Sequence, residues 1–207
     1  MYTPSVNKLA NINEILDFIN RFSFGLLISK AGGRIIGTHI PILTNNDPAQ
    51  LKLYTHIALA NSQWKEIEGQ EVLAIFTEPH AYISTTHYTK EETVPTWNYV
   101  AIHIYGKASI LHGADEIMDL MDRTMVKYEQ AYYDKWLRLP DDFKSKMLNG
   151  IVAFQIDVTE VQGKAKLSQN KTVQEIENII AGLASSTMPN ESLVAEYMNK
   201  YARKDPH

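Results

Sequence analysis

The sequence predicts an antiparallel β-barrel flanked by helices, and three observations support this fold class. Segments with apolar residues at every second position follow one another along the chain, separated by short turn signals. A few helical segments interrupt them, without the regular alternation of strand and helix that parallel sheets need. The longest candidate strand, within Val94 to Gly106, is apolar or aromatic on both alternating faces.

Composition narrows the class of protein. The chain has 207 residues and is 44% hydrophobic, which suits one large domain or a domain with a helical appendage. A net charge of −4 gives no general electrostatic footprint for nucleic acid. The absence of cysteine excludes disulfides and thiolate chemistry and fits a reducing compartment. Without a signal-like stretch or a run of about eighteen apolar residues, a soluble cytoplasmic protein is expected.

The first elements are a helix and a hairpin. Asn11 and Glu14 form a capping pair ahead of apolar residues at helical spacing, which predicts a short helix over residues 12–19. Alternating segments at 22–28 and 36–42 flank a Gly-Gly turn and therefore predict a hairpin. The same signals then predict strands at 51–57 and 71–77, with one or two helical turns at 61–68.

The long strand, from Trp97 to about Leu111, has an unusual second face. Val100, Ile102 and Ile104 point one way and belong in a core. The other face carries Trp97, Tyr99, Ala101, His103 and Tyr105. Such an aromatic row indicates a subunit interface, a flat ligand or both, and the alternative is a strand buried on both faces of a sandwich.

The second half of the chain is predicted to be mainly helical. Apolar residues form one helical stripe over 117–128, and Asp141 can cap a shorter helix. Residues 151–161 return to strand character. Thr172 and Glu175 form a capping box for a further helix, and a last amphipathic helix follows Pro189. We therefore predict a domain over residues 1–187 and a C-terminal helical extension over 188–207.

Three polar clusters are candidates for a site. Residues 164–171 combine lysines with side-chain donors before a helix start, so they form either an anion or polar-ligand site or a solvated loop. In residues 54–64, donors surround the small Ala58 and Ala60, although His56 and Trp64 are as readily structural. The connecting segment 79–88 holds His80 and His87 without a metal-ligand spacing, so no metal is expected. Hydrolase and phosphate-loop motifs are absent.

Taken in order, these clusters resemble the PaiB-like family of FMN-binding (negative transcriptional regulator) proteins. The matching pieces are Met1-Tyr-Thr-Pro4, His39-Ile-Pro41, His56-Ile-Ala-Leu-Ala-Asn-Ser-Gln-Trp64, Pro79-His-Ala-Tyr-Ile-Ser84, Val94-Pro-Thr-Trp-Asn-Tyr99 with His103 and Gly106, and Gly163-Lys-Ala-Lys-Leu-Ser-Gln-Asn170. They extend over nearly the whole chain, from residue 1 to about 185. Their shared order makes the resemblance specific.

The resemblance implies an antiparallel split β-barrel of the FMN-binding type, working as a homodimer with FMN at or near the subunit interface. An isologous interface would cover the aromatic face of the long strand. By analogy with split-barrel flavoproteins, the strand around His39 and the strand-to-helix passage from Thr55 to Trp64 would line the phosphate and ribityl side, and further candidates lie on the long strand and the lysine segment. The residues so assigned are His39, Thr55, His56, Asn61, Gln63, Trp64, Trp97, Asn98, Lys166, Ser168, Gln169 and Asn170.

The chain departs from the family's motifs at four positions. Leu59 and Ser62 replace the arginine and proline of Ala-Arg-Ala-Asn-Pro-Gln-Trp. His87 and Ala165 stand where related motifs carry tryptophan. If that arginine neutralises the phosphate of FMN, a positive charge is missing here. The pocket is then reshaped or emptied, and the occupancy by FMN becomes an open question.

Several functions remain open at this stage. The first is an FMN-binding protein with a regulatory or redox-sensing role, in which the flavin supplies the chemistry. The second is a flavin-dependent oxidoreductase of the flavin reductase type, in which His39, His56 or His103 serves as general acid. The third is a cofactor-free dimeric interaction module, and heme binding through a histidine is a minor variant. Without a helix-turn-helix signal, no direct DNA binding is expected, and no membrane partner is expected either.

Overall fold

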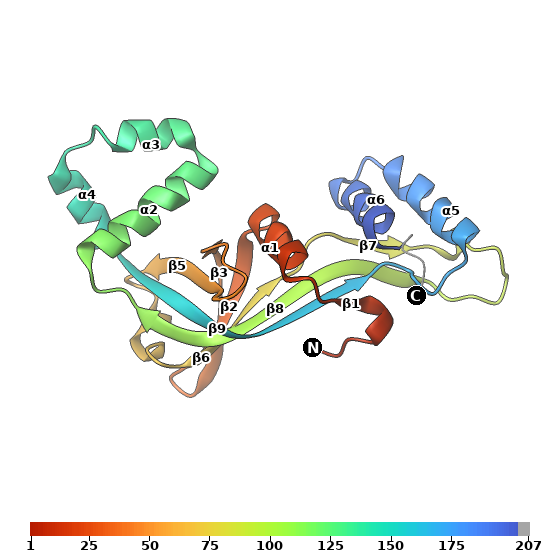
Figure 1. The fold of residues 1–207 in the computed structure, drawn as a ribbon, viewed down its shortest axis with the longest axis horizontal. Coiled ribbons are helices and arrows are strands. Elements are labelled where there is room, and N and C mark those ends of the chain that lie inside the picture. The colour runs from red at the N-terminus through yellow and green to blue at the C-terminus, as the bar shows by residue number, and fades with distance from the viewer. Residues whose placement is uncertain (203–207) are drawn as a thin grey trace. The chain divides into compact units, whose positions relative to one another are not determined.

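A computed structural model describes residues 1–202 of the protein (Figure 1). Within these residues nine strands form one sheet. The strands are β1 (Lys8–Leu9), β2 (Phe24–Ala31), β3 (Arg34–Pro41), β4 (Leu43–Thr44), β5 (Lys52–Ala58), β6 (Glu71–Phe76), β7 (His80–Ile83), β8 (Thr96–Ile110) and β9 (Ile151–Lys166). Their order is β3-β2-β6-β8-β9-β5-β4, with β1 beside β9 and β7 beside β8. The registered pairs are antiparallel, as the predicted fold class requires, and the sheet is not closed, since its path ends at β3 and β4.

Six α-helices and three short 3-10 helices accompany the sheet in the described residues. The α-helices are α1 (Ile12–Arg21), α2 (Ala114–Tyr128), α3 (Gln130–Trp136), α4 (Asp141–Leu148), α5 (Val173–Ala184) and α6 (Pro189–Tyr201). The 3-10 helices are η1 (Ser5–Asn7), η2 (Ser62–Glu66) and η3 (Thr85–His87). No helix of residues 1–202 is long and apolar enough to cross a membrane.

The chain divides into two compact units. Among the described residues, unit 1 contains residues 1–15, 76–103 and 162–202. Unit 2 contains residues 16–75 and 104–161. Strands β8 and β9 are the longest among the described residues, and the unit boundaries at residues 103 and 162 fall within them.

The predicted hairpin in unit 2 is confirmed as β2 and β3. Gly32 and Gly33 form its turn at φ +58° and +72°, in the left-handed region that glycine adopts without steric cost. The alternation in β2 buries Gly25, Leu27, Ser29 and Ala31. The opposite face therefore leaves larger side chains at the surface, and Phe24 is 65% exposed.

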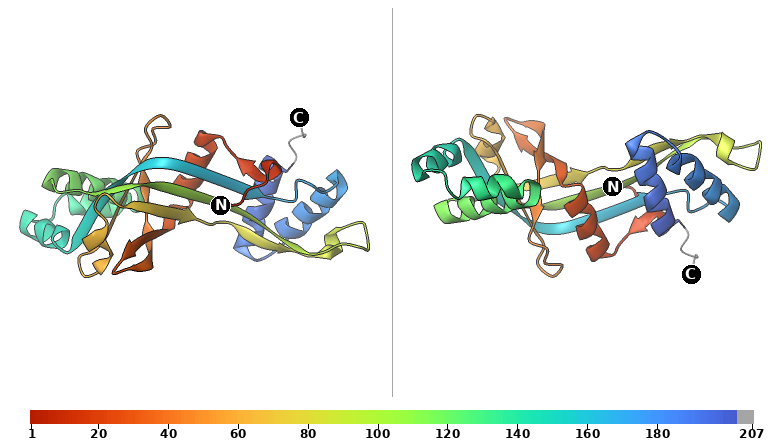
Figure 2. Two further views of the ribbon diagram at one scale, coloured as in Figure 1. Left: turned by 90° about the horizontal axis from the view of Figure 1, so that it is seen from below. Right: turned by 90° about the horizontal axis from the view of Figure 1, so that it is seen from above.

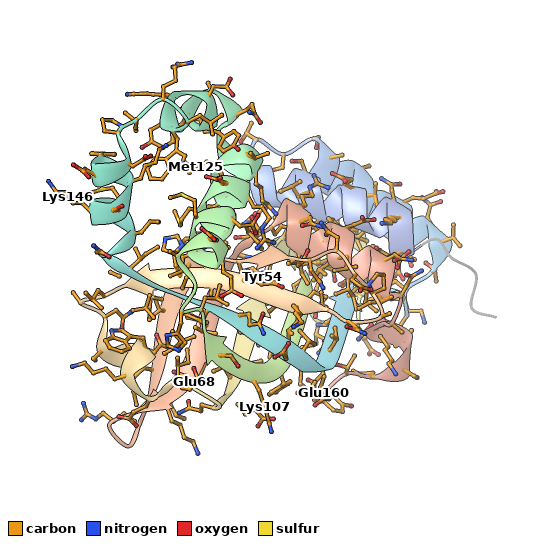
Figure 3. All side chains as sticks on the ribbon, turned by 60° about the vertical axis from the view of Figure 1, so that its left-hand side comes forward. Tyr54, Glu68, Lys107, Met125, Lys146 and Glu160 are labelled. Atoms are coloured by element: carbon orange, nitrogen blue, oxygen red, sulfur yellow. The ribbon has the colours of Figure 1, made fainter. Side chains whose placement is uncertain are left out.

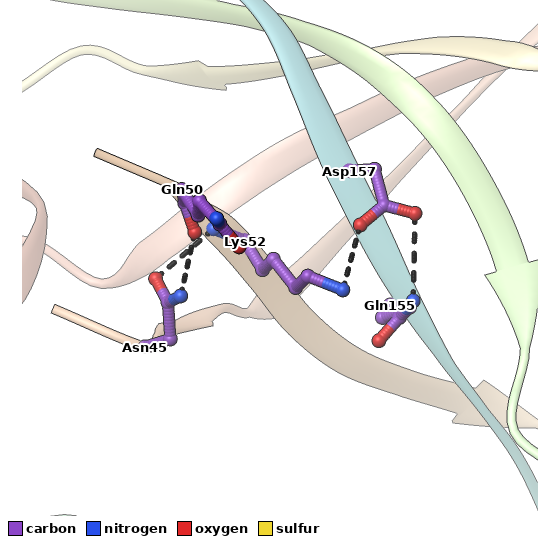
Figure 4. A network of polar contacts seen from close by, with 5 residues as sticks. All are labelled: Asn45, Gln50, Lys52, Gln155 and Asp157. Atoms are coloured by element: carbon purple, nitrogen blue, oxygen red, sulfur yellow. Dashed lines mark hydrogen bonds and ion pairs between the residues drawn. The ribbon is translucent and has the colours of Figure 1, made fainter. Parts of the chain in front are cut away.

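Strands β4, β5 and β9 form the other part of unit 2. The Asn45 side chain closes the β4–β5 turn, donating to the Gln50 carbonyl over 2.7 Å and accepting from the Lys52 amide over 3.0 Å (Figure 4). The Lys52 ammonium lies 3.0 Å from the Asp157 carboxylate on β9, and Gln155 donates to the same carboxylate. These contacts fix the register in which Lys52 pairs with Asp157.

Helices α2, α3 and α4 follow β8 and precede β9 in unit 2. Met125, labelled in Figure 3, is buried on α2, and the Arg123 guanidinium lies 4.6 Å from the ring centroid of Tyr54 on β5. The buried Trp136 of α3 donates to Asp122 over 3.1 Å. The prediction missed α3 entirely. It also expected Asp141 as a cap, whereas Asp141 is the first helical residue after Pro140.

In unit 1, two segments that were predicted as loops contain strand residues. The segment 79–88, predicted as a connection, contains β7, which pairs with β8 so that His80 lies opposite Tyr99 and Tyr82 opposite Trp97. Strand β9, predicted to end near residue 161, continues to Lys166. The residues expected in a loop after the strand therefore begin inside it.

The two C-terminal helices lie side by side in unit 1 (Figure 2). The capping box that opens α5 is confirmed, because Thr172 accepts from the Glu175 amide and Glu175 accepts from the Thr172 amide. Helix α6 begins at Pro189 as predicted and buries Val194, Tyr197 and Met198. The last part of the predicted extension, residues 203–207, lies outside the described residues.

Candidate functional site

A network of polar side chains in unit 2 surrounds the fully buried Gln63. Its amide nitrogen donates to the Ser29 hydroxyl over 2.9 Å, and its amide oxygen accepts from the Thr38 hydroxyl over 2.5 Å. The Asn61 side chain donates to the same Thr38 hydroxyl over 3.1 Å and accepts from the backbone amide of Gln63 over 3.0 Å. We call these four residues the Gln63 network. It holds η2 against β2 and β3, because buried polar groups must keep their hydrogen bonds.

Thr55 and His56 occupy opposite faces of β5. Thr55 is buried, and its hydroxyl donates to the Pro41 carbonyl over 2.6 Å. His56 is half-buried, and burial lowers the pKa of its imidazole from 6.5. His56 is therefore neutral at pH 7 and offers one donor and one acceptor.

The turn at residues 58–62 is the accessible part of this region. Ala58, Leu59, Ala60 and Ser62 are exposed, and Leu59 is 47% exposed. The indole nitrogen of Trp64 donates to the Leu59 carbonyl over 2.8 Å and so fixes the turn. No lysine or arginine occurs from Thr55 to Trp64. The turn thus presents small and neutral groups on a rigid support.

His39 lies on the outer face of the sheet in unit 2. It pairs across the hairpin with Leu26 and stacks on Phe24 at a centroid distance of 6.4 Å. Residues directly opposite in an antiparallel pair share one face, so Leu26 also lies beside Ile75, and Ile28 beside Leu73. His39 therefore borders an exposed apolar surface, to which Ile35, at 76% exposure, also belongs.

The remaining predicted site residues lie in unit 1. Asn98 is fully buried, accepts from the Ser168 hydroxyl over 3.0 Å and donates to the Met198 sulfur over 3.3 Å. Ser168 has φ +64°, the left-handed conformation of a tight turn. Asn98 and Ser168 thus join β8, the turn after β9 and α6, and their polar groups serve packing.

The side chains of the lysine segment are held by contacts to backbone carbonyls, a hydroxyl and an aromatic ring. Lys164 is buried and donates to the Tyr2 carbonyl, and Lys166 donates to Thr96 over 2.5 Å. The Lys171 ammonium lies 3.7 Å from the Tyr88 ring centroid. Gln169 closes the turn on the Ala165 carbonyl and the Leu167 amide, while Asn170 is exposed. The solvated-loop alternative was wrong because backbone and ring contacts hold these side chains.

An aromatic surface lies on β7 and β8 of unit 1. Trp97 is 52% exposed and contacts Tyr82 edge-on at 5.8 Å and His80 at 6.1 Å. Beside them is a shallow pocket of about 350 Å³. The opposite face, with Ile102 and Ile104, is fully buried, so β8 is a core strand whose outer face is exposed at its Trp97 end. At this end, β8 is therefore not buried on both faces, which was the alternative considered from the sequence.

His103 lies further along the same strand. Its Nδ1 is buried without a hydrogen-bond partner in the described chain, and burial followed by the nearby N-terminal ammonium lowers its pKa. Sequence reasoning missed two members of the Gln63 network, Ser29 and Thr38. The only signal for Thr38 was a polar residue in an apolar alternation. Within residues 1–202, no three His, Asp or Glu side chains gather as a metal site would need.

The fold defined by this sheet and its helices is that of the flavin-binding split barrels. The structure resembles an FAD- and heme-binding protein of Mycobacterium smegmatis with a TM-score of 0.62 and 13% identity, covering 85% of this chain and 80% of that one. It also resembles a flavocytochrome of Azotobacter vinelandii with a TM-score of 0.59 and 12% identity, covering 74% of this chain and 65% of that one.

Sequence comparison gives the family. Residues 1–160 match the family described as "Putative FMN-binding domain". The chain is 37% identical over 207 residues to the "Protease synthase and sporulation protein PAI 2" of Bacillus subtilis, covering 99% of both chains. The protein therefore belongs to this family, and the resemblance predicted from its motifs is confirmed.

Proposed function

We propose that the protein binds FMN at the outer side of the unit 2 turn and has a regulatory or redox-sensing role. The observation that carries the proposal is the match of residues 1–160 to a family described as FMN-binding, a range that contains the Gln63 network and the 58–62 turn. The sporulation function in the name of its Bacillus subtilis relative supports a regulatory role. The bound flavin would supply redox chemistry that the side chains lack.

The residues of this region fit the neutral part of a flavin. The Ser62 hydroxyl and the imidazoles of His39 and His56 suit ribityl hydroxyls and the polar edge of the ring. Ala58 and Ala60 have small side chains, so a ligand can approach the backbone of the turn closely. Thr55, Asn61 and Gln63, predicted as contacts, are occupied by internal hydrogen bonds, and we assign them the role of holding the turn in place.

The same residues do not neutralise a phosphate. Leu59 stands at the family's arginine position, and it is an exposed residue in the turn. An ionised hydrogen-bond partner is worth roughly twice a neutral one. We therefore propose that FMN is held mainly through its ribityl chain and ring, and that it exchanges readily with free FMN.

We propose further that a second copy of the chain covers the exposed apolar surface of β2 and β3. Phe24 and Ile35 are exposed there, and Leu26 and Ile28 lie on the same face of β2, beside Ile75 and Leu73 of β6. Exposed aromatic and branched side chains on one sheet face favour self-association. Because His39 borders this surface, the flavin would lie close to the partner copy. We propose no direct DNA contact, and a gel shift with purified protein should show no salt-sensitive complex.

Fluorescence titration with FMN and riboflavin tests the proposal. Because the phosphate has no cationic partner, the two ligands should bind with dissociation constants within about threefold of each other. Binding of FMN more than about a hundredfold tighter than riboflavin would contradict the neutral site. Rapid oxidation of NADH or NADPH by the FMN-loaded protein would contradict the regulatory role and indicate an oxidoreductase.

A further inference from the structure

Strand β7 of unit 1 has one edge that no strand of the described chain covers, because β7 pairs with β8 alone. The Val100 amide of β8 donates to the Pro79 carbonyl over 3.2 Å, so these two residues form a hydrogen-bonded pair directly before β7. Hydrogen-bonded and non-hydrogen-bonded pairs alternate along an antiparallel ladder. The backbone N–H and C=O groups of His80 and Tyr82 therefore point away from β8, toward the open edge.

The outward backbone groups of β7 are unpaired. No hydrogen bond within residues 1–202 reaches the backbone of His80 or Tyr82 from the outer side. Proteins commonly protect such an edge with a lysine, a proline or a bulge, and β7 contains none of these. The edge thus presents two donors and two acceptors at the spacing of a β-strand. The group that complements such a row is another extended polypeptide backbone.

The side chains beside this edge are aromatic and accessible. His80 and Tyr82 are exposed, and the Trp97 ring centroid lies 6.1 Å from that of His80 and 5.8 Å from that of Tyr82. The shallow pocket of about 350 Å³, which His80, Trp97 and Tyr99 line, opens on the same face. The other face of β7 is buried. A strand added at the edge would therefore place alternate side chains against exposed rings and the pocket.

We propose that the β7 edge binds an extended peptide segment of another protein as an additional antiparallel strand. The segment carries large apolar side chains at alternate positions. Its residues directly opposite His80 and Tyr82 exchange both backbone hydrogen bonds with them and place their side chains on the aromatic face. This inference is independent of the proposed function, because the edge shares no residue with the 58–62 turn.

The test is a fluorescence anisotropy titration of the full chain into a fluorescein-labelled peptide, Lys-Thr-Phe-Thr-Phe-Thr-Lys with an amidated C-terminus. Two isomers carry two N-methyl groups each, one on both phenylalanine amides and the other on the last two threonine amides. In the proposed pairing the phenylalanine amides donate to β7, and the threonine amides point away from it.

The two isomers should differ in affinity. The unmodified peptide should bind saturably, the threonine-methylated isomer within about threefold of it, and the phenylalanine-methylated isomer at least about tenfold more weakly. Equal binding of the two isomers, or no saturable binding of the unmodified peptide, would overturn the proposal. This comparison leaves the protein unchanged, so it decides even where a variant fails to fold.

Two variants locate the binding on unit 1. Trp97→Ala removes an exposed ring beside the edge and should weaken peptide binding at least about tenfold. Phe143→Ala truncates an exposed ring on α4 of unit 2 and should leave the affinity unchanged. Peptide binding unchanged in Trp97→Ala would refute the site, whether or not FMN binds elsewhere.

A third variant separates the peptide from a second copy of this chain. Tyr82→Pro removes an outward N–H that takes no part in the pairing with β8, a place where an edge strand tolerates proline. It should weaken peptide binding and leave the oligomeric state in light scattering unchanged. A wild-type dimer that becomes monomeric in Tyr82→Pro would show that a second copy covers the edge, and would overturn the proposal.

Discussion

Leu59 is the residue at which this chain differs most consequentially from its family's motif. It lies exposed in a turn whose carbonyl is held by the Trp64 indole, so a new side chain there would not disturb the core. Leu59→Arg should tighten FMN binding about tenfold by supplying a cation for the phosphate and leave riboflavin unchanged. Leu59→Gln, without the charge, is the control. Equal tightening of riboflavin in the fluorescence titration would contradict this explanation.

The hydrogen bonds of the Gln63 side chain should stabilise the fold, and a substitution tests this. Gln63→Leu keeps the volume of the side chain but leaves the Ser29 and Thr38 hydroxyls without their side-chain partner, whereas Asn61 keeps its bond to the backbone amide of residue 63. The free energy of unfolding in urea should fall by about 2–3 kcal/mol, as for other losses of buried hydrogen bonds. Gln50→Leu, at an exposed position, should change it by less than about 0.5 kcal/mol. A similar small effect at Gln63 would show that the network is not stabilising.

The segment that follows β7 is attached to helix α5 through hydrogen bonds to the Glu175 carboxylate. The buried Glu175 accepts from the Thr89 amide and hydroxyl and from the Thr172 amide. These backbone hydrogen bonds, with that from Thr89 the largest cause, lower the pKa of Glu175 below its ordinary value of 4.5. Asn178 also donates to the His87 carbonyl, so the same helix holds the segment at two points.

This attachment has a defined pH dependence. Because the pKa in the folded state is lowered, the stabilisation is complete above pH 4.5 and is lost as pH falls through the folded-state pKa. Glu175→Gln should therefore lower the stability at pH 7, and the difference from the wild type should shrink in acid. Urea unfolding of both proteins at pH 7 and near pH 3.5 measures this difference in the free energy of unfolding. A difference that stays constant across this range would contradict the assignment to the carboxylate.

Elements with a clear period could be predicted from the sequence, and those held only by tertiary contacts could not. The hairpin, β8 and α5 were predicted because alternation, paired glycines and a Thr-x-x-Glu box are local signals. Strand β7 was missed because exposed His80 and Tyr82 obscure its alternation with buried Ala81 and Ile83. Helix α3 was missed because Glu129 gives it no side-chain cap.

The candidate site was predicted less completely than the fold. Thr55, Asn61 and Gln63 have the donors that a ligand site needs, but the structure turns those donors inward. The lysines at 164, 166 and 171 are likewise occupied by a carbonyl, a hydroxyl and a ring that are distant in sequence. Which partner a polar side chain finds depends on long-range packing, and local spacing does not contain that information.

At the scale of the whole molecule, the account requires a dimer. Ile35→Glu would place an unpaired carboxylate on the surface proposed to meet the second copy, and burying it would be costly. Light scattering in dilute solution should show a dimer for the wild type and a monomer for this variant. Arg34→Glu, the adjacent exposed residue on the other face of β3, should remain dimeric. A monomeric wild type, or an unchanged Ile35→Glu dimer, would contradict the proposed surface.

Calorimetric titration of the purified chain with FMN measures flavin binding directly. We expect saturable binding with one FMN per chain and a dissociation constant of about 1–100 μM, as for a site without a phosphate cation. Absence of saturable binding at millimolar FMN, with the protein folded and dimeric, would contradict flavin binding by this member of the family.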